Sequence, residues 1–180
     1  MNALIISDSH GYPDRIERAI KAQKKILKRG EILTLFFLGD GLRDIYSSLE
    51  NEDTVIYSVK GNCDFGFLCD PQGEEIPPSR LVNFGSLRIF MTHGHLFDVK
   101  STLCRAEAEA IKQGADILLF GHTHNRTELY IPQGTLPCQD KRLAVFNPGS
   151  LGLPNFGAPS FGTLTIKDGG FVLSHGDLAY

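Results

Sequence analysis

Side chains that can bind metal ions follow several short apolar runs in this sequence. The clearest case is the motif GHTH at 121–124, where His122 and His124 come directly after the apolar run 117–120. In an extended chain, residues i and i+2 point to the same side, so both imidazoles can face one point in space. Paired histidines at this spacing indicate a metal site. Two hydrogen-bonded surface histidines would have the same spacing, so the interpretation depends on ligands from other strand ends.

Four further apolar runs are followed by oxygen or nitrogen donors, namely Asp8 with His10, Asp40, Asn62, and His93. Each has a plainer explanation: Asp40 and Asn62 adjoin glycines and would suit turns, and a histidine at a strand end can simply be hydrogen-bonded. The ordered set of seven favours a functional interpretation. Mixed carboxylate, amide and imidazole donors suit Mn, Fe, Ni or Zn better than Ca or Mg.

The elements that must position these donors alternate between strands and helices. Apolar residues predict strands over 4–6, 32–38 and 54–59, with helices from about Pro13 to Gly30 and over 42–49. The buried face of the first helix is expected to carry Ile16, Ala19, Ile20, Ile26 and Leu27. This order is typical of a parallel doubly wound sheet, whose sites lie beyond the carboxyl ends of the strands.

The second half of the chain predicts another sheet. The pattern indicates a hairpin of strands over 80–84 and 87–91, followed by a helix over 101–113. It then indicates strands over 116–120, 129–131 and 143–146, a turn at 147–150, and two final strands over 162–166 and 171–174. Alternating polarity in the final strands predicts a half-exposed antiparallel pair. Two sheets packed face to face and flanked by helices fit this order.

Length and composition limit the class of protein. At 180 residues the chain is long enough for one domain with a substantial core, which we expect to span 1–180. The net charge of -3 gives no strong nucleic-acid signal. The apolar runs are too short to cross a membrane, and no signal peptide is indicated. We therefore expect a cytoplasmic protein with its four cysteines as thiols.

The seven donors together resemble those of the calcineurin-like metallophosphoesterases. That family's motifs DxH, GD, GN, HGH and GHxH occur here in the same order, and the resemblance runs from Asp8 to Ser150. The sequences GNCD, THGH and NPGS resemble more narrowly its small YfcE-type phosphodiesterase branch. The resemblance implies a four-layer α/β/β/α sandwich of two packed mixed sheets. It also implies two divalent transition metal ions, with manganese expected and iron, nickel or zinc as alternatives.

The same resemblance implies how the donors divide. One ion is expected to be held by Asp8, His10 and His124, and the other by Asn62, His93 and His122. Asp40 is expected to bridge the two ions. Asp40, Asn62 and His93 are the implied catalytic residues. Two ions ~3.5 to 4 Å apart can activate a bridging hydroxide for in-line attack on a phosphate ester. Because Asn62 is neutral, such a centre keeps a net charge of about +1 and attracts a phosphodiester anion.

Cys63 stands where many larger relatives have a histidine that assists the leaving group. A thiol with an ordinary pKa of ~8.5 is a poor substitute for an imidazolium acid. We interpret Cys63 as a packing residue, with substrate contact as the alternative. A protein-interaction scaffold, like the retromer subunit of this small fold, and a phosphomonoesterase are alternative functions, although seven intact ligands favour an enzyme over a scaffold.

Other residues are candidates for contact with a small phosphate-ester substrate. His95 is expected to face the phosphate, a metal ligand or solvent, and Arg126 either a phosphate or solvent. His175 is expected to be structural or exposed. Self-association into a homo-oligomer stays open.

Three loops are expected to shape the entrance, at 65–79, 133–140 and 151–159. Their phenylalanines, Phe65, Phe67 and Phe156, could either stack on a base or pack within the loops.

Overall fold

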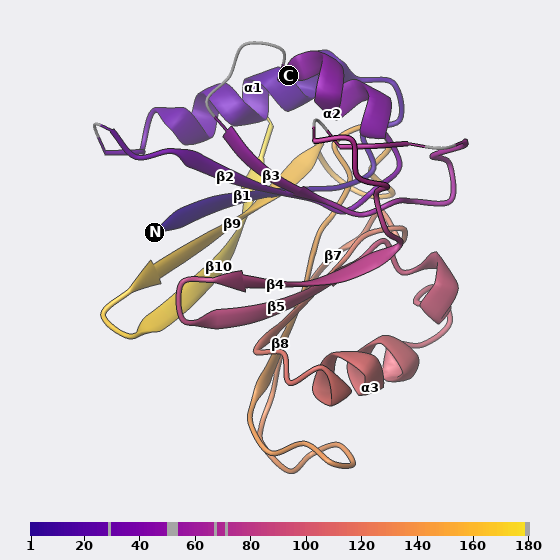
Figure 1. Cartoon of the computed structure of the whole chain (residues 1–180), viewed down its shortest axis with the longest axis vertical. Helices are drawn as coiled ribbons and strands as arrows, with labels where there is room; N and C mark the ends of the chain where they lie inside the picture. Colours follow the sequence, from indigo (N-terminus) through magenta and orange to yellow (C-terminus); the bar gives the residue numbers. More distant parts are fainter. Residues whose placement is uncertain (29, 50–53, 67, 71, 179–180) are drawn as a thin grey trace.

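Two β-sheets of five strands each form the centre of the computed structural model (Figure 1), which describes residues 1–28, 30–49, 54–66, 68–70 and 72–178. Helices cover the outer face of each sheet (Figure 1). The chain therefore forms four layers in the order helix, sheet, sheet, helix.

The first sheet contains the N-terminal and C-terminal strands in the order β10-β9-β1-β2-β3. The central strand β1 (Asn2–Ile6) pairs in parallel with β2 (Leu33–Phe37), which pairs in parallel with β3 (Thr54–Ser58). On the other side of β1, β9 (Ser160–Lys167) and β10 (Gly170–Asp177) are antiparallel. The predicted antiparallel pair is thus confirmed.

The second sheet has the order β4-β5-β6-β8-β7. Its parallel centre comprises β5 (Leu87–Thr92), β6 (Ile117–Phe120) and β8 (Leu143–Pro148). The antiparallel edges are β4 (Ser79–Phe84) and β7 (Arg126–Ile131). Both sheets are therefore mixed, as predicted.

Among the described residues, three apolar clusters hold the four layers together. One lies between the sheets, with Phe36 of the first sheet and Phe146 of the second fully buried within it. A second packs α1 (Pro13–Lys24) and α2 (Leu42–Ser48) on the first sheet. A third packs α3 (Cys104–Lys112) on the second sheet. Apolar burial of this kind is the main stabilising term of a fold, and the predicted α/β/β/α sandwich is confirmed.

Three local predictions are wrong. The first helix ends at Lys24, where the N–H of Ile26 bonds back to Gln23 in a tighter turn, and Ile26 is 65% exposed instead of buried. The loop 133–140 joins the far ends of β7 and β8, away from the end where Arg126 pairs with Pro148, so it does not border the entrance. The predicted turn at 147–150 begins later, because β8 extends through Pro148.

A further short 3-10 helix, η1 (His95–Phe97), was not expected from the sequence. Among the residues that the structure describes, none of the helices is both long and apolar enough to span a membrane.

Candidate metal centre

The seven predicted donors come together where the carboxyl ends of parallel strands from both sheets meet. Asp8 and His10 follow β1, and Asp40 and Asn62 follow β2 and β3. The other three histidines come from the second sheet: His93 follows β5, and His122 and His124 follow β6. The strand order therefore explains how donors spread over 117 positions of sequence reach one place.

The backbone at these positions is unusual. Five donors have φ between 45° and 65°, a left-handed conformation that is uncommon outside glycine: Asp8, His10, Asp40, His122 and His124. Glycines allow the loops to approach closely, because a Cβ on Gly61 would lie 2.1 Å from Asp40 Oδ1 and one on Gly121 would lie 2.0 Å from Ser7 Oγ. Such strain is typical of functional sites.

Asp8 lies at the centre of the first group of donors. Its Oδ2 accepts hydrogen bonds from the Ser7 hydroxyl and the His122 N–H. Its Oδ1 is buried and, within the described part of the chain, accepts no hydrogen bond. The Nε2 atoms of His124 and His10 nevertheless lie 3.1 Å and 3.7 Å from Oδ1. A buried anionic oxygen without a partner is costly, and a cation at this point would satisfy it.

A second group surrounds His93, whose Nε2 lies 3.1 Å from Asn62 Oδ1 and 3.3 Å from Asp40 Oδ2. Donor atoms of Asp40, His93 and His122 all lie within 4.8 Å of one another, as do those of Asp8, His10 and His124. Asp40 also lies close to the first group, with Oδ2 3.8 Å from His10 Nε2. The residues thus fit two neighbouring cations with Asp40 between them.

Backbone carbonyls select the histidine nitrogen that faces this centre. His93 Nδ1 lies 2.7 Å from the carbonyl oxygen of Leu38, and His124 Nδ1 lies 2.6 Å from that of Leu153. A carbonyl only accepts, so both Nδ1 atoms carry the proton. The lone pair of each neutral imidazole is then on Nε2, directed toward the carboxylates, as in metal-binding histidines.

The carboxylates and imidazoles also alter one another's pKa values. Burial opposes ionisation of Asp8, but the imidazoles of His10 and His124 and the charge of His93 hold its pKa below the ordinary value. Burial likewise opposes ionisation of Asp40, and contact with His93 outweighs it and lowers its pKa. For His122, burial and the positive charge of His93 lower the pKa to about 4. His122 is therefore neutral at pH 7, the form of imidazole that binds metals.

His93 and His124 have the opposite shift. Burial lowers the pKa of His93, but its contact with Asp40 and the charge of Asp8 outweigh this and raise it. Contact with Asp8 raises the pKa of His124. The two carboxylates thus favour positive charge at the centre, whether it is carried by protons or by bound cations.

Several residues that support the site were not identified from the sequence. The carboxylate of Asp64, in the GNCD motif, accepts four backbone hydrogen bonds and joins the loop of Asp40 to that of Asn62. Asp44 accepts hydrogen bonds from Ser9 Oγ and the Gly11 N–H. These contacts link loops that are distant in sequence, and only the preference of aspartate for turns pointed to them.

The end of β8 supports the site in the same way. Asn147 Nδ2 donates to the carbonyl of Gly121 at 2.9 Å, and Ser150 Oγ donates to the carbonyl of Asp8 at 2.8 Å. The NPGS motif therefore holds the backbone of two donor-bearing loops. His175 packs behind it, since its Nε2 lies 2.8 Å from the Asn147 carbonyl oxygen and its ring stacks on Phe146.

Candidate substrate-contact residues surround the centre. Cys63 is exposed, so its interpretation as a packing residue is wrong. Partial burial of its sulfur and the nearby Asp40, Asp64 and Asp8 carboxylates raise the pKa of the thiol to about 11. The His95 ring is 5.4 Å from that of His93, and burial lowers the pKa of His95.

Arg126 forms an ion pair with Asp177 and borders a pocket that His124 also lines. Phe65 and Phe156 are exposed. Phe67 lies outside the described residues.

Comparison with known proteins gives a family match over most of the chain. Residues 1–169 match the calcineurin-like phosphoesterase superfamily domain. A probable metallophosphoesterase of Bacillus subtilis, YsnB, is 33% identical over 172 residues, which cover 93% of this chain and 86% of that protein. Phosphodiesterase YfcE of Escherichia coli is 28% identical over 184 residues, which cover 91% of this chain and 87% of that protein.

Two further relatives extend the range of similar proteins. Vacuolar protein sorting-associated protein 29 of Schizosaccharomyces pombe is 28% identical over 96% of this chain and 89% of that protein. A predicted phosphoesterase of Streptococcus pneumoniae has a solved structure with a TM-score of 0.73 and 26% identity, covering 98% of this chain and 88% of that chain. The match thus includes proteins named as phosphoesterases and a protein named for sorting.

Proposed function

Because this chain belongs to the calcineurin-like phosphoesterase superfamily, we propose that it is a phosphodiesterase that depends on two divalent metal ions. One observation carries the proposal. Buried Asp8 Oδ1 has no hydrogen-bond partner in the described residues, and imidazole nitrogens surround it at distances that suit a shared cation. A site that merely supported the fold would satisfy this oxygen with an N–H or O–H donor.

The donors divide between the two ions as two groups and one bridging residue. The first ion would be held by Asp8, His10 and His124, and the second by Asn62, His93 and His122. Asp40 would bridge them. The distances within each group support this division, as does the position of Asp40 Oδ2 between His10 and His93. Mixed oxygen and nitrogen donors fit manganese, with iron, nickel or zinc as the alternatives.

When bound, two such ions supply Lewis-acid chemistry, lowering the pKa of water and offsetting negative charge on phosphoryl oxygens. The residues of the chain prepare for this chemistry. The carbonyls of Leu38 and Leu153 hold the Nε2 atoms of His93 and His124 toward the centre. Asn62 contributes a neutral oxygen, so that the donor set carries only the charges of Asp8 and Asp40. The centre then retains positive charge that attracts a phosphate ester.

Two other functions remain as alternatives. A phosphomonoesterase would use the same donors. The similarity to vacuolar protein sorting-associated protein 29 is the observation that supports a protein-interaction scaffold as an alternative. Against the scaffold, every one of the seven donor positions holds a residue that can bind a metal. A cytoplasmic location and self-association stay predictions.

Metal analysis together with an activity assay tests the proposal. Purified protein is stripped with a chelator, reloaded with Mn²⁺, and assayed with bis-p-nitrophenyl phosphate and with p-nitrophenyl phosphate. We expect about two ions per chain and a higher kcat/KM for the diester. Higher kcat/KM for the monoester would favour the phosphomonoesterase, and protein that binds no transition metal and turns over neither ester would refute the enzyme.

A further inference from the structure

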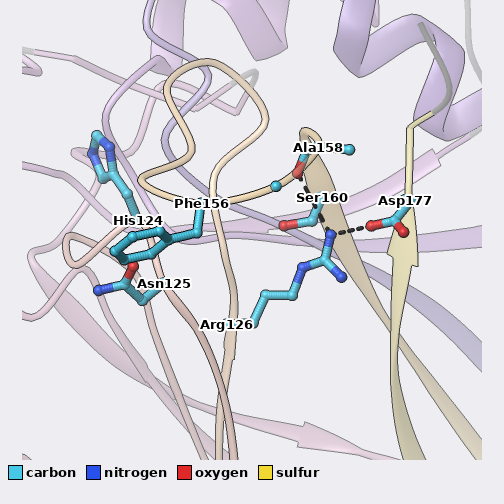
Figure 2. Close-up of a pocket in the computed structure, with 8 residues that line it drawn as sticks. His124, Asn125, Arg126, Phe156, Ala158, Ser160 and Asp177 are labelled. Atoms are coloured by element: carbon cyan, nitrogen blue, oxygen red, sulfur yellow. Dashed lines mark hydrogen bonds and ion pairs between the residues drawn. The ribbon is translucent and has the colours of Figure 1, made fainter.

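A pocket lies beside the metal centre, and His124 belongs to both. It has a volume of about 440 Å³, within the roughly 300 to 1,000 Å³ typical of small-molecule sites. Its other lining residues include Asn125, Arg126, Phe156 and Asp177. Figure 2 shows Phe156 toward His124 and Asn125, and Asp177 with Ser160 toward the other end. A group attached to a phosphate at the centre could therefore extend past His124 into this pocket.

Phe156 is the unusual member of the lining. The residue is 85% exposed, so it contributes little to the hydrophobic core. An exposed phenylalanine leaves a large apolar surface in water, which contact with an aromatic ligand would cover. Phe156 thus presents a largely exposed apolar face in the lining of a pocket of small-molecule size.

The loop that carries Phe156 is tied to the metal centre. Its Leu153 carbonyl accepts from His124 Nδ1 at 2.6 Å, and its Asn155 Nδ2 donates to the Thr123 carbonyl at 2.8 Å. At the start of the loop, the N–H of Gly152 donates to the Asp8 carbonyl at 2.9 Å. These bonds connect the segment 152–155 to the loop of Asp8 and to the loop of His124, both of which carry candidate metal donors. Phe156 is therefore positioned relative to the centre, and a ligand meets a partly ordered surface.

Arg126 forms another part of the pocket lining. Its guanidinium is paired with Asp177 and lies 3.5 Å from the Ala158 carbonyl oxygen (Figure 2). Because Asp177 offsets its charge, Arg126 is poorly suited to bind a phosphate in this arrangement. A guanidinium plane held in this way can instead stack on an aromatic group.

We propose that this pocket is a subsite for one ester arm of the substrate, an aromatic group that stacks on Phe156. The inference rests on the proposed phosphodiesterase function and specifies its substrate class. A second recess of about 490 Å³ also borders the centre, and its lining includes His10, Asp40, Cys63 and Phe65. A phosphodiester has an arm for each recess, whereas a monoester can fill only one.

Steady-state kinetics of Mn²⁺-loaded protein with bis-p-nitrophenyl phosphate test the subsite. Phe156→Ala should raise KM roughly threefold to tenfold, the value of one aromatic contact, with kcat within about twofold. Phe156→Tyr should restore the KM, because it retains the ring. Tyr130→Ala removes an aromatic residue that is 54% exposed on β7 and is the matched control, with no change expected.

A binding measurement separates this inference from the proposed catalysis. Dibenzylphosphinate, in which methylene groups replace the ester oxygens of a diaryl diester, is not hydrolysed, and diethylphosphinate is its counterpart without rings. Calorimetric titration of the Mn²⁺-loaded protein should show that the dibenzyl compound binds more tightly. Phe156→Ala should reduce that preference by a similar threefold to tenfold, while Tyr130→Ala leaves it unchanged.

The outcomes distinguish the two proposals. An active enzyme whose KM and aryl preference do not change in Phe156→Ala would overturn the subsite but leave the phosphodiesterase intact. The subsite would also be overturned if only Phe65→Ala lost the preference for dibenzylphosphinate over diethylphosphinate, since the aromatic arm would then occupy the other recess. Wild-type protein that turns over no ester would refute the proposed function, whatever the titration shows.

Discussion

Asp64 provides a sharp test of how the centre is held together. Its buried carboxylate accepts the N–H groups of Asp40, Gly41, Leu42 and Gly61 at 2.8 to 2.9 Å, two on each oxygen. Asp64→Asn keeps the shape of the side chain but replaces one acceptor oxygen with an NH₂ group. Whichever way the amide turns, two backbone N–H groups then face a donor and lose their acceptor.

The structure sets the size of the effect. A buried donor left without an acceptor costs about 1 to 3 kcal/mol, so two such donors should lower the free energy of unfolding by about 4 kcal/mol. For a chain of 180 residues, about 1 kcal/mol corresponds to roughly 2 to 4 °C in Tm. We therefore expect Tm to fall by roughly 8 to 16 °C. Because Asp64 also positions Asp40, kcat should fall at temperatures where the variant is folded.

Differential scanning calorimetry of metal-free wild type and Asp64→Asn measures the stability, and the diesterase assay measures kcat. Asp168→Asn makes the same chemical change at a side chain that is 85% exposed, and its Tm should change by less than about 2 °C. A Tm of Asp64→Asn within 2 °C of wild type would refute the reasoning, because the four hydrogen bonds would then contribute little.

Three further substitutions test individual residues. Asp40→Asn should lower kcat by at least ~10² while leaving the fold near intact, because it removes the charge that we propose bridges the two ions; full activity with two bound ions would contradict the bridging role. Cys63→Ala should keep diesterase kcat within about tenfold, since a thiol with a pKa of about 11 is a weak acid catalyst at neutral pH, and a loss of ~10² would make Cys63 catalytic. His175→Ala should lower the free energy of unfolding by about 1 to 3 kcal/mol, through lost stacking on Phe146 and one hydrogen bond, with kcat unchanged; a large fall in kcat would show that His175 acts in turnover.

The strands and the candidate metal donors that follow them could be predicted because both depend on local patterns. The runs at 4–6 and 117–120 are apolar because they are buried on both faces of a sheet, and donors follow them directly. Parallel pairing then brings the strand ends together. Pairing within one sheet does not join Asp8, which follows a strand of the first sheet, to His124, which follows a strand of the second and is 116 positions away. The resemblance to the metallophosphoesterases was needed to predict that these two residues would lie in one site.

The supporting contacts depend on tertiary structure, which local patterns do not contain. The four hydrogen bonds of Asp64 require the loops after β2 and β3 to be in place already. The left-handed conformation of five donors likewise results from loop packing, which overrides the preference of each residue. The position of the loop 133–140 depends on the length of the β7–β8 pairing, and its glycine and proline content could not indicate which end of the sheet it borders.

The central claim is that His122 and His124 bind different ions, although they are only two residues apart. Anomalous diffraction from crystals of the Mn²⁺-loaded protein, collected at the manganese edge, measures this directly. We predict two peaks with Asp40 between them, one contacted by His124, Asp8 and His10 and the other by His122, His93 and Asn62. A single peak contacted by both His122 and His124 would contradict the account.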